Sequence, residues 1–331
     1  MKGPFQELTG LSPSRRAWLR FRRRKSSGFA LACLVFIGGL ALAAPWLPLA
    51  EPSAIHPEFA TTPPSFTGAD LAPAANTPRA EGPQHSASEA GAPWVLPPLC
   101  GRDALGRDLL SRIIWGARIS LLTALAAALV SLLIGVTWGA VAGACGGWID
   151  EGMMRIVDLL ESLPFIFVVI FLVTVARGSG WFAGPIANLI VFFLTLGLVY
   201  WLTMARIVHG QVITLRKREF VDGARALGAG GGRILAAHIL PNLTPVIIVT
   251  LTLTIPRILL IEAFLSFLGL GVQAPHVSWG TLSRDAFEVL TPVETPWWLV
   301  VYPSLAMVIT LVCLQHLGDA LRDAWSPKEG A

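Results

Sequence analysis

Long stretches without Asp, Glu, Lys or Arg divide this chain into apolar segments separated by shorter polar ones. A helix needs about 20 mostly apolar residues to cross the hydrocarbon core of a bilayer. The segments free of charged residues are Ser26–Ala50, Ile119–Ile149, Ser162–Val175, Gly178–Ala205, Leu240–Pro256 and Thr295–Gly318. The pattern therefore predicts an all-α, polytopic membrane protein with about six transmembrane helices.

Two of these segments are too short to span a bilayer by themselves. Ser162–Val175 reaches the required length only with Ile156–Glu161 added, which brings two carboxylates near one end. Leu240–Pro256 reaches it only by taking Arg257, and Glu262 beyond it, into the membrane. We therefore expect ionisable residues in or at the edge of both spans.

Composition agrees with a membrane protein, because 54% of the residues are hydrophobic and 14% are charged, against about 25% charged in an average soluble domain. The first apolar segment is much longer than the apolar region of a cleaved signal peptide. We expect it to be retained as a transmembrane helix.

Clustered basic residues predict an orientation. Seven Arg and Lys residues lie between residues 15 and 25 and six lie in the loop 206–241, whereas the segment 265–296 holds only Arg284. Basic residues flank the cytoplasmic ends of spans, so this placement is preferred over nucleic-acid binding, and both termini are expected inside. The expected segments are a basic cytoplasmic tail 1–25, a first transmembrane helix 26–50, an external Pro/Ala-rich linker 51–100, a core 101–319 with five transmembrane helices, and a cytoplasmic tail 320–331.

One group of charges disagrees with this orientation. Four arginines just before the second span fall on the side predicted to be external: Arg102, Arg107, Arg112 and Arg118. Long loops cross the membrane largely regardless of their charge, and this loop exceeds 60 residues. The expected orientation therefore stands despite these four arginines.

Familiar catalytic and ligand-binding motifs are missing from the sequence. There is no phosphate-binding G-x-x-x-x-G-K-[ST], no H-E-x-x-H and no G-x-S-x-G, and the six histidines show no metal-ligand spacing. The four cysteines include no C-x-x-C pair, so neither a zinc site nor a redox pair is indicated. We expect no enzyme activity and no cofactor in this chain, so uphill transport would need energy from a partner.

The most informative segment lies between the fourth and fifth spans. Arg218–Leu227 has the composition of a short helix, with Val221, Ala224 and Leu227 spaced to form one apolar ridge. Gly228 can end this helix because glycine adopts a positive φ without steric cost. A second short helix, 233–240, is expected to stop at the following proline, giving a helix–turn–helix elbow.

This elbow resembles the cytoplasmic loop of importer permeases of the ABC transporter superfamily, which reads E-A-A, three residues, G, and later L-P. The matching residues are Asp222-Gly223-Ala224, Gly228 and Leu240-Pro241, at the same spacing. Asp222 keeps the charge of the family's Glu on a shorter arm. Gly223 replaces an alanine, which costs up to ~1 kcal/mol of helix propensity.

Further stretches narrow the resemblance to dipeptide and oligopeptide permeases of the second-subunit type. They are Gly101–Arg112, Gly116–Leu121, Met154–Asp158, Ser162–Pro164, Ser266–Gln273, Ser278–Gly280 and Gly318–Asp323. These stretches occur in the family's order. The resemblance as a whole runs from about residue 14 to 328 and is lost only in the linker 51–98.

The resemblance implies the type I importer fold and a subunit that moves peptides or peptide-like solutes across the bacterial cytoplasmic membrane. It implies a second permease subunit, two ATPase subunits that hold ATP and Mg²⁺, and an extracytoplasmic substrate-binding protein. It also implies that the loop 206–241 couples this chain to an ATPase subunit. The residues expected to carry this coupling are Asp222, Gly223, Ala224, Gly228, Leu240, Pro241, Arg218 and Arg225.

Three ionisable residues are candidates for the translocation pathway: Arg257, Glu262 and Glu161. Ionisable residues inside a membrane usually face a cavity or a partner, so Arg257 could attract a peptide's terminal carboxylate. The alternatives are that it pairs with Glu262 or another helix, or reaches the interface. Asp158 is expected to face Arg155, and Glu161 either lines the pathway or lies at the inner membrane edge.

Other functions remain open from sequence alone. Relatives in the same family carry nickel complexes or other solutes. A transporter driven by an ion gradient would need polar residues distributed through its spans, and a non-transporting scaffold would need no coupling loop. Co-purification of an ATPase subunit would distinguish the importer from both.

Overall fold

The computed structural model describes residues 19–22, 24–65, 97–178, 184–291 and 295–325. Most of the basic tail 1–25, the middle of the linker 51–100 and the end of the tail 320–331 lie outside the described residues. The named secondary-structure elements of the described residues are all helices. The expectation of an all-α protein is therefore confirmed.

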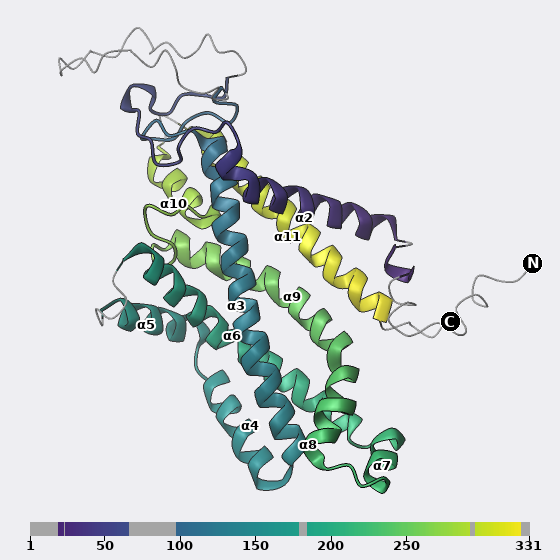
Figure 1. Cartoon of the computed structure of the whole chain (residues 1–331). Coiled ribbons are helices and arrows are strands. Elements are labelled where there is room, and N and C mark those ends of the chain that lie inside the picture. The colour runs from purple at the N-terminus through teal and green to yellow at the C-terminus, as the bar shows by residue number, and fades with distance from the viewer. Residues whose placement is uncertain (1–18, 23, 66–96, 179–183, 292–294, 326–331) are drawn as a thin grey trace, which may run out of the picture. The chain divides into compact units, whose positions relative to one another are not determined.

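Among the described residues, five helices are long and apolar enough to cross a membrane, or six if one bent pair forms a single span (Figure 1). The five are formed by α2 (Lys25–Ala43, continued by a 3-10 turn at Ala44–Trp46), α3 (Leu109–Cys145), α6 (Pro185–Leu215), α9 (Leu240–Phe267, continuous with the preceding segment from Gly231) and α11 (Trp297–Trp325). The prediction of about six transmembrane helices is confirmed.

The expected third span is broken. Helix α4 (Gly147–Glu161) and helix α5 (Phe165–Gly178) meet at an angle of 88°. Pro164 lies in the break. Proline has no N–H to donate and disfavours a helical conformation in the preceding residue, so a continuous helix is interrupted here.

The start of helix α9 differs from expectation, because the helix that precedes Pro241 does not stop there. A short α8 (Gly231–Arg233) continues through a π-helical segment, Ile234–Ile239, directly into α9. The Leu240 N–H donates to the carbonyl of Leu235, five residues back. This wider turn gives the ring of Pro241 more room against the preceding turn than an α-helix would.

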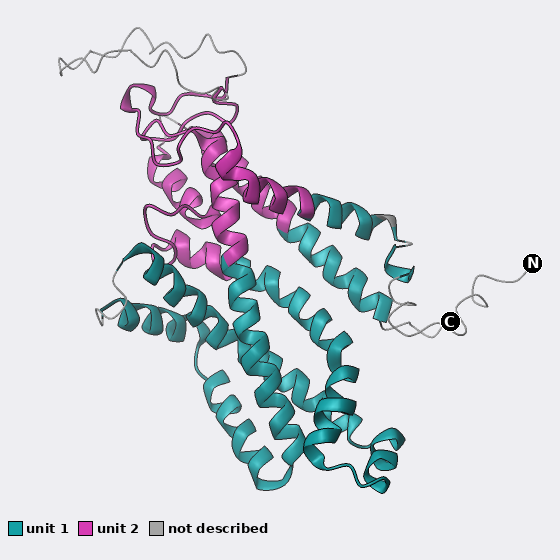
Figure 2. Cartoon of the chain, viewed as in Figure 1, with its two compact units in different colours: residues 1–34, 123–260, 311–331 teal, residues 35–122, 261–310 magenta. Residues whose placement is uncertain are grey.

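The chain divides into two compact units, coloured separately in Figure 2. Unit 1 comprises residues 1–34, 123–260 and 311–331, and unit 2 comprises residues 35–122 and 261–310. Unit 1 holds α4 to α8, and unit 2 holds α10 (Trp279–Val289) together with the ends of α3 and α9.

In unit 1, helices α3 and α6 approach closely along glycines spaced four residues apart. A Cβ added to Gly139 would clash with the carbonyl oxygen of Ala205. One added to Gly135 would lie 2.6 Å from Met204 Cβ, and one added to Gly143 would lie 2.9 Å from Val212 Cβ. Small residues at this spacing let the backbones of membrane helices pack against each other. This glycine stripe fixes α6, and with it the start of the 206–241 loop.

The two ends of the described chain meet inside unit 1. Phe21 packs with Ala320 and Ala324 in a small apolar cluster. An ion pair joins Arg24 Nη1 to Asp323 Oδ2 at 2.7 Å. The beginning of α2 and the end of α11 therefore lie together.

Unit 2 contains a helix that the sequence analysis did not predict. Helix α10 begins with a capping box in which the Ser278 side chain accepts from the Thr281 N–H, while the Thr281 hydroxyl accepts from the Ser278 N–H. Ser278 satisfies a free N–H at the helix start, so the Ser-x-x-Thr pattern could have indicated the beginning of this helix.

Candidate functional site

The predicted elbow is present, and its short helix ends as its glycine requires. Helix α7 runs over Glu219–Ala226, and Gly228 follows with φ +82°. The Ala229 N–H donates to the Ala224 carbonyl at 3.0 Å, and the Gly228 N–H to the Arg225 carbonyl at 2.9 Å. These two bonds form the Schellman motif that satisfies the last carbonyls of a helix.

One face of α7 is locked into the core of unit 1. Val221 is fully buried and Ala224 is 9% exposed. They share one apolar cluster with residues of α3, α6, the π-helical segment and α9: Ala140, Met204, Val208, Val212, Ile234, Ile239 and Leu243. Figure 1 shows α7 and α8 at the end of unit 1 where α3 turns into α4.

The predicted apolar ridge is shorter than expected. Leu227 is 90% exposed and Phe220 is 42% exposed. Leu227 is the C-cap residue, with ψ 6°, so it no longer follows the helical path that aligns Val221 with Ala224. The prediction that Leu227 joins the ridge is wrong, and its side chain projects outward.

The expected coupling residues therefore divide between two faces of the loop. Asp222, Gly223, Arg225 and Gly228 are exposed, as are Arg218 and Pro241, whereas Ala224 is buried and Leu240 packs against the apolar cluster. The structure brings Asp222 and Arg225 together, with Oδ1 and Nη1 3.1 Å apart. Such an exposed pair contributes little to stability, so it mainly sets the orientation of the two side chains.

Glu262 is enclosed within unit 2. Its side chain is fully buried and accepts hydrogen bonds from the hydroxyls of Ser120, at 2.9 Å, and Ser266, at 2.8 Å. The Ser120 hydroxyl also accepts from the Trp279 N–H, and the Ser266 hydroxyl from the Val272 N–H. Glu262 thus organises the turn between α9 and α10, a role that the sequence analysis did not consider.

The carboxylates at the broken span pair differently from the prediction. Asp158 Oδ1 lies 2.9 Å from Arg206 Nη2, and Glu161 also pairs with Arg206. Arg155 instead lies 4.0 Å from Glu151, so the prediction that Asp158 faces Arg155 is wrong. Arg206 on α6 reaches both carboxylates at the α4–α5 break, which the sequence spacing within α4 could not indicate.

Arg257 is exposed on α9 within unit 1. It lies ten residues before the end of α9 at Phe267, which is about 15 Å along the axis. If the outer edge of the hydrocarbon core is near Phe267, Arg257 lies close to the bilayer centre, because that core is about 30 Å thick.

The arginines that opposed the predicted orientation are largely engaged inside unit 2. Arg112, 3% exposed, pairs with Asp103 at 2.5 Å and with Asp285 at 3.0 Å. Arg107 contacts the same two carboxylates, and Arg102 stacks on the ring of Phe59. These partners offset much of the positive charge near the start of α3.

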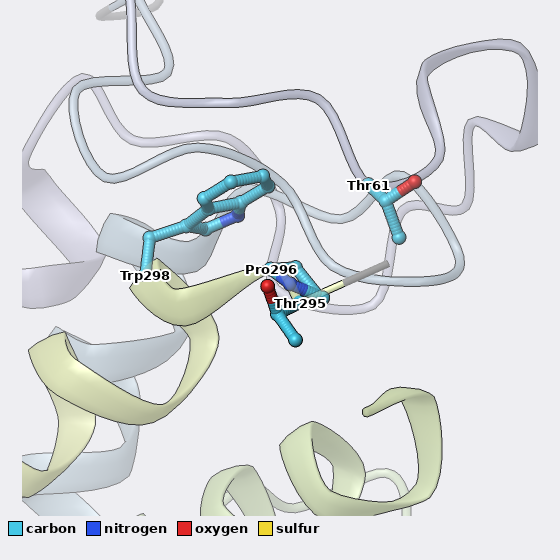
Figure 3. A pocket seen from close by; sticks show the side chains of 4 residues that line it. All are labelled: Thr61, Thr295, Pro296 and Trp298. Atoms are coloured by element: carbon cyan, nitrogen blue, oxygen red, sulfur yellow. The ribbon is translucent and has the colours of Figure 1, made fainter. Parts of the chain in front are cut away.

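The same unit has a shallow pocket of about 280 Å³ lined by Thr61, Thr295, Pro296 and Trp298 (Figure 3). The Trp298 indole N–H donates to the Arg102 carbonyl at 3.4 Å. Among the described residues, no group of three His, Cys, Asp or Glu side chains could hold a metal ion.

Comparison with known proteins decides the family. The family described as "Binding-protein-dependent transport system inner membrane component" matches residues 135–329. This chain belongs to that family. A second family, "N-terminal TM domain of oligopeptide transport permease C", matches residues 12–64. This inner membrane component is therefore a multi-pass transport permease, and the part that contains α7 lies within the matched region.

Named relatives of this permease cover most of its length. The dipeptide transport system permease protein DppC of Bacillus subtilis is 36% identical over 96% of this chain and 87% of that protein. The oligopeptide transport system permease protein OppC of Haemophilus influenzae is 42% identical over 69% of this chain and 70% of that protein. That of Escherichia coli is also 42% identical, over 69% and 72%.

Solved structures agree on the fold. Two inward-facing structures of the MetNI methionine ABC transporter match with TM-scores of 0.51 and 0.52 at 18% and 19% identity. They cover 64% and 65% of this chain, and 96% and 97% of the matched chain. The permease thus has the fold of an ABC importer permease.

Proposed function

We propose that this chain is a permease subunit of an ATP-driven importer that carries dipeptides or oligopeptides across the bacterial cytoplasmic membrane. Its named relatives are dipeptide and oligopeptide permeases. The observation that carries the proposal is the two-faced character of α7. Its inner face is buried against helices of unit 1, while Phe220 and Leu227 remain exposed on a loop that also carries charged residues.

The complete importer, in this proposal, contains a second permease subunit, two ATPase subunits and an extracytoplasmic substrate-binding protein. ATP and Mg²⁺ bind to the ATPase subunits, and this chain binds no cofactor and catalyses no reaction. The ATPase groove covers the exposed side of α7, including Leu227. Burying an exposed leucine at the tip of a loop against a partner stabilises the complex, because apolar surface is removed from water.

Coupling then follows from how α7 is attached. Interiors packed at crystal-like density transmit displacement rather than absorbing it. Val221 and Ala224 share their cluster with α6 and with the start of α9, so a push on α7 moves both helices. Closure of the ATPase dimer around ATP would thereby change which side of the membrane the pathway opens to.

Both termini of the described chain are proposed to be cytoplasmic. The ion pair between Arg24 and Asp323 supports a common side for the two ends. The basic residues before α2 and in the 206–241 loop favour the cytoplasm for that side.

For the pathway, Arg257 is the proposed contact for a substrate carboxylate. An exposed arginine near the bilayer centre would cost about 2.5–3.5 kcal/mol by insertion scales if it faced lipid, so a water-filled path is its favoured neighbour. Glu161 stands beside Arg206 near the inner edge and is proposed to line the inner mouth. Glu262 is proposed to support the α9–α10 turn rather than to contact substrate, since its side chain is buried.

The test is uptake of labelled peptides of graded length by vesicles that contain the whole assembly with its binding protein. ATP-dependent uptake of peptides supports the proposal. Uptake of a nickel complex but of no peptide would show that the substrate is a nickel complex. Uptake that needs no ATP and is abolished by an ionophore would show a transporter driven by an ion gradient. The absence of a co-purifying ATPase subunit would leave a membrane scaffold.

Arg257→Ala should lower peptide uptake in this assay, while an assembly carrying Arg284→Ala serves as the control. Arg284 pairs with the exposed Glu288 in unit 2, outside any proposed pathway. Equal uptake by the two variants would remove Arg257 from the pathway and leave the importer proposal intact.

A further inference from the structure

A basic pocket lies beside α7 in unit 1. It has a volume of about 250 Å³ and is lined by Ile213, Arg216, Lys217 and Arg225. Arg216 is held in place because its Nη1 donates to the Gly143 carbonyl at 2.6 Å. The lining thus brings three cationic side chains to one cavity, Arg216 and Lys217 from the turn after α6 and Arg225 from α7.

Among the described residues, the lining of the basic pocket carries three cations and no carboxylate. Arg225 pairs with Asp222 at 3.1 Å, so Asp222 offsets the charge of one of the three. Arg225 and Lys217 are exposed, and Arg216 is half-buried. A concave site with an excess of positive charge attracts an anionic group and raises its local concentration.

The length of α6 indicates which kind of anion can reach this site. Helix α6 has 31 residues, which is about 46 Å, whereas the hydrocarbon core is about 30 Å thick. With Pro185 placed at the outer edge of the hydrocarbon core and α6 along the membrane normal, Arg206 lies about 32 Å along the axis, and Ile213 about 10 Å further. Each headgroup layer adds only about 5–7 Å, so a lipid phosphate would fall short of the basic pocket.

We infer that the basic pocket binds an acidic side chain, Asp or Glu, of the ATPase subunit that docks on α7. This inference rests on the proposed function, because it assumes an ATPase partner at the 206–241 loop. The exposed Leu227 and the basic pocket give that partner two separate points of attachment. Two points resist rotation of the partner about α7, which a single short helix cannot do.

Lysine content makes a direct chemical test feasible. The chain has four lysines, Lys2, Lys25, Lys217 and Lys328, so Lys217 is the one lysine of the 206–241 loop. A water-soluble carbodiimide joins a lysine amine to a carboxylate in contact with it, as an amide, with no spacer. In the purified assembly of both permeases and both ATPase subunits, we expect mass spectrometry to find Lys217 joined to an Asp or Glu of an ATPase subunit. Lys217→Arg should abolish this product while the ATPase subunit stays bound.

Charge reversal provides the second measurement. Lys217→Glu should lower retention of the ATPase subunit on the tagged permease about tenfold at low salt, because reversing an interface charge opposes association there, and the difference should shrink as salt screens it. Arg233→Glu is the matched control, since Arg233 is exposed in the same loop but does not line the pocket.

The outcomes separate this inference from the proposed function. If the wild-type permease retains no ATPase subunit, the proposed function itself fails. If the wild type retains it but Lys217 forms no cross-link to it, or Lys217→Glu behaves like Arg233→Glu, only the pocket inference fails. An anionic lipid that the wild-type assembly retains and Lys217→Glu releases would also overturn it.

Discussion

Two glycines of the 206–241 loop, five residues apart, are expected to respond oppositely to alanine. Gly223 lies inside α7, and a Cβ added there meets nothing within 4 Å. Gly228 follows α7 with φ +82°, and a Cβ added there also meets nothing within 4 Å. Neither substitution creates a clash, so each effect comes from backbone preference alone.

The magnitudes follow from helix propensity and from the left-handed conformation. Alanine in place of glycine inside a helix stabilises it by about 1 kcal/mol. Alanine in the left-handed region costs roughly 1–2 kcal/mol, which Gly228 avoids. We therefore expect Gly223→Ala to stabilise α7 against local opening and Gly228→Ala to destabilise it.

Hydrogen exchange of the α7 amides measures this opening, because protection reports the local free energy of opening. Gly223→Ala should raise protection about fivefold, and Gly228→Ala should lower it by roughly five- to thirtyfold, at about 1.4 kcal/mol per tenfold change. In the complete assembly, substrate-stimulated ATPase activity should fall for Gly228→Ala and be retained for Gly223→Ala.

If both variants raised the hydrogen-exchange protection of the α7 amides, or both lowered it, this explanation of α7 would be refuted. Unchanged protection in Gly228→Ala would show that the Schellman motif does not hold the end of the helix. Full coupling by Gly228→Ala despite lost protection would show that the rigidity of α7 is not what transmits motion.

Three further predictions concern other parts of the chain. Gly139→Ala should lower the free energy of unfolding by about 1–3 kcal/mol through overpacking, whereas Gly210→Ala, with nothing within 4 Å of the added Cβ, should not; equal melting temperatures would contradict the α3–α6 contact. Burial raises the pKa of Asp108 to about 6. The stability that Asp108 contributes is therefore greatest at low pH and falls by up to about 3 kcal/mol as pH rises toward and through 6. The melting temperature of Asp108→Asn relative to wild type should rise between pH 4.5 and 7, and parallel melting-temperature profiles would exclude this. Arg206→Gln leaves two carboxylates facing each other at the α4–α5 break and should lower the melting temperature more than Arg155→Gln, whose partner lies 4.0 Å away in a well-exposed pair.

The lengths of the apolar segments by themselves determined much of this protein's architecture. Spans and their number follow from the cost of placing charges in hydrocarbon, which depends on composition alone. The end of α7 was also predictable, because Gly228 supplies a backbone conformation that other residues reach only at a cost. The family resemblance of the 206–241 loop was also visible in the sequence, because it depends on the spacing of Asp222, Gly228 and Pro241 along the chain.

Tertiary structure decided which side chains meet. Asp158 pairs with Arg206 rather than Arg155, because α6 brings an arginine to the α4–α5 break from 48 residues away. Glu262 is buried against Ser120 because of how the start of α3 packs in unit 2. Such contacts depend on packing between distant segments, which spacing along one helix does not contain.

The elbow shows both limits in one segment. Local propensity predicted a short helix ending at glycine, whereas the outward position of Leu227 depended on where the helical turn ceased. Continuity through Pro241 depended on a π-helical turn that no periodicity indicates. Sequence alone thus determined that the chain bends here, and the packing of α7 against α6 and α9 decided which face of the bend is left for a partner.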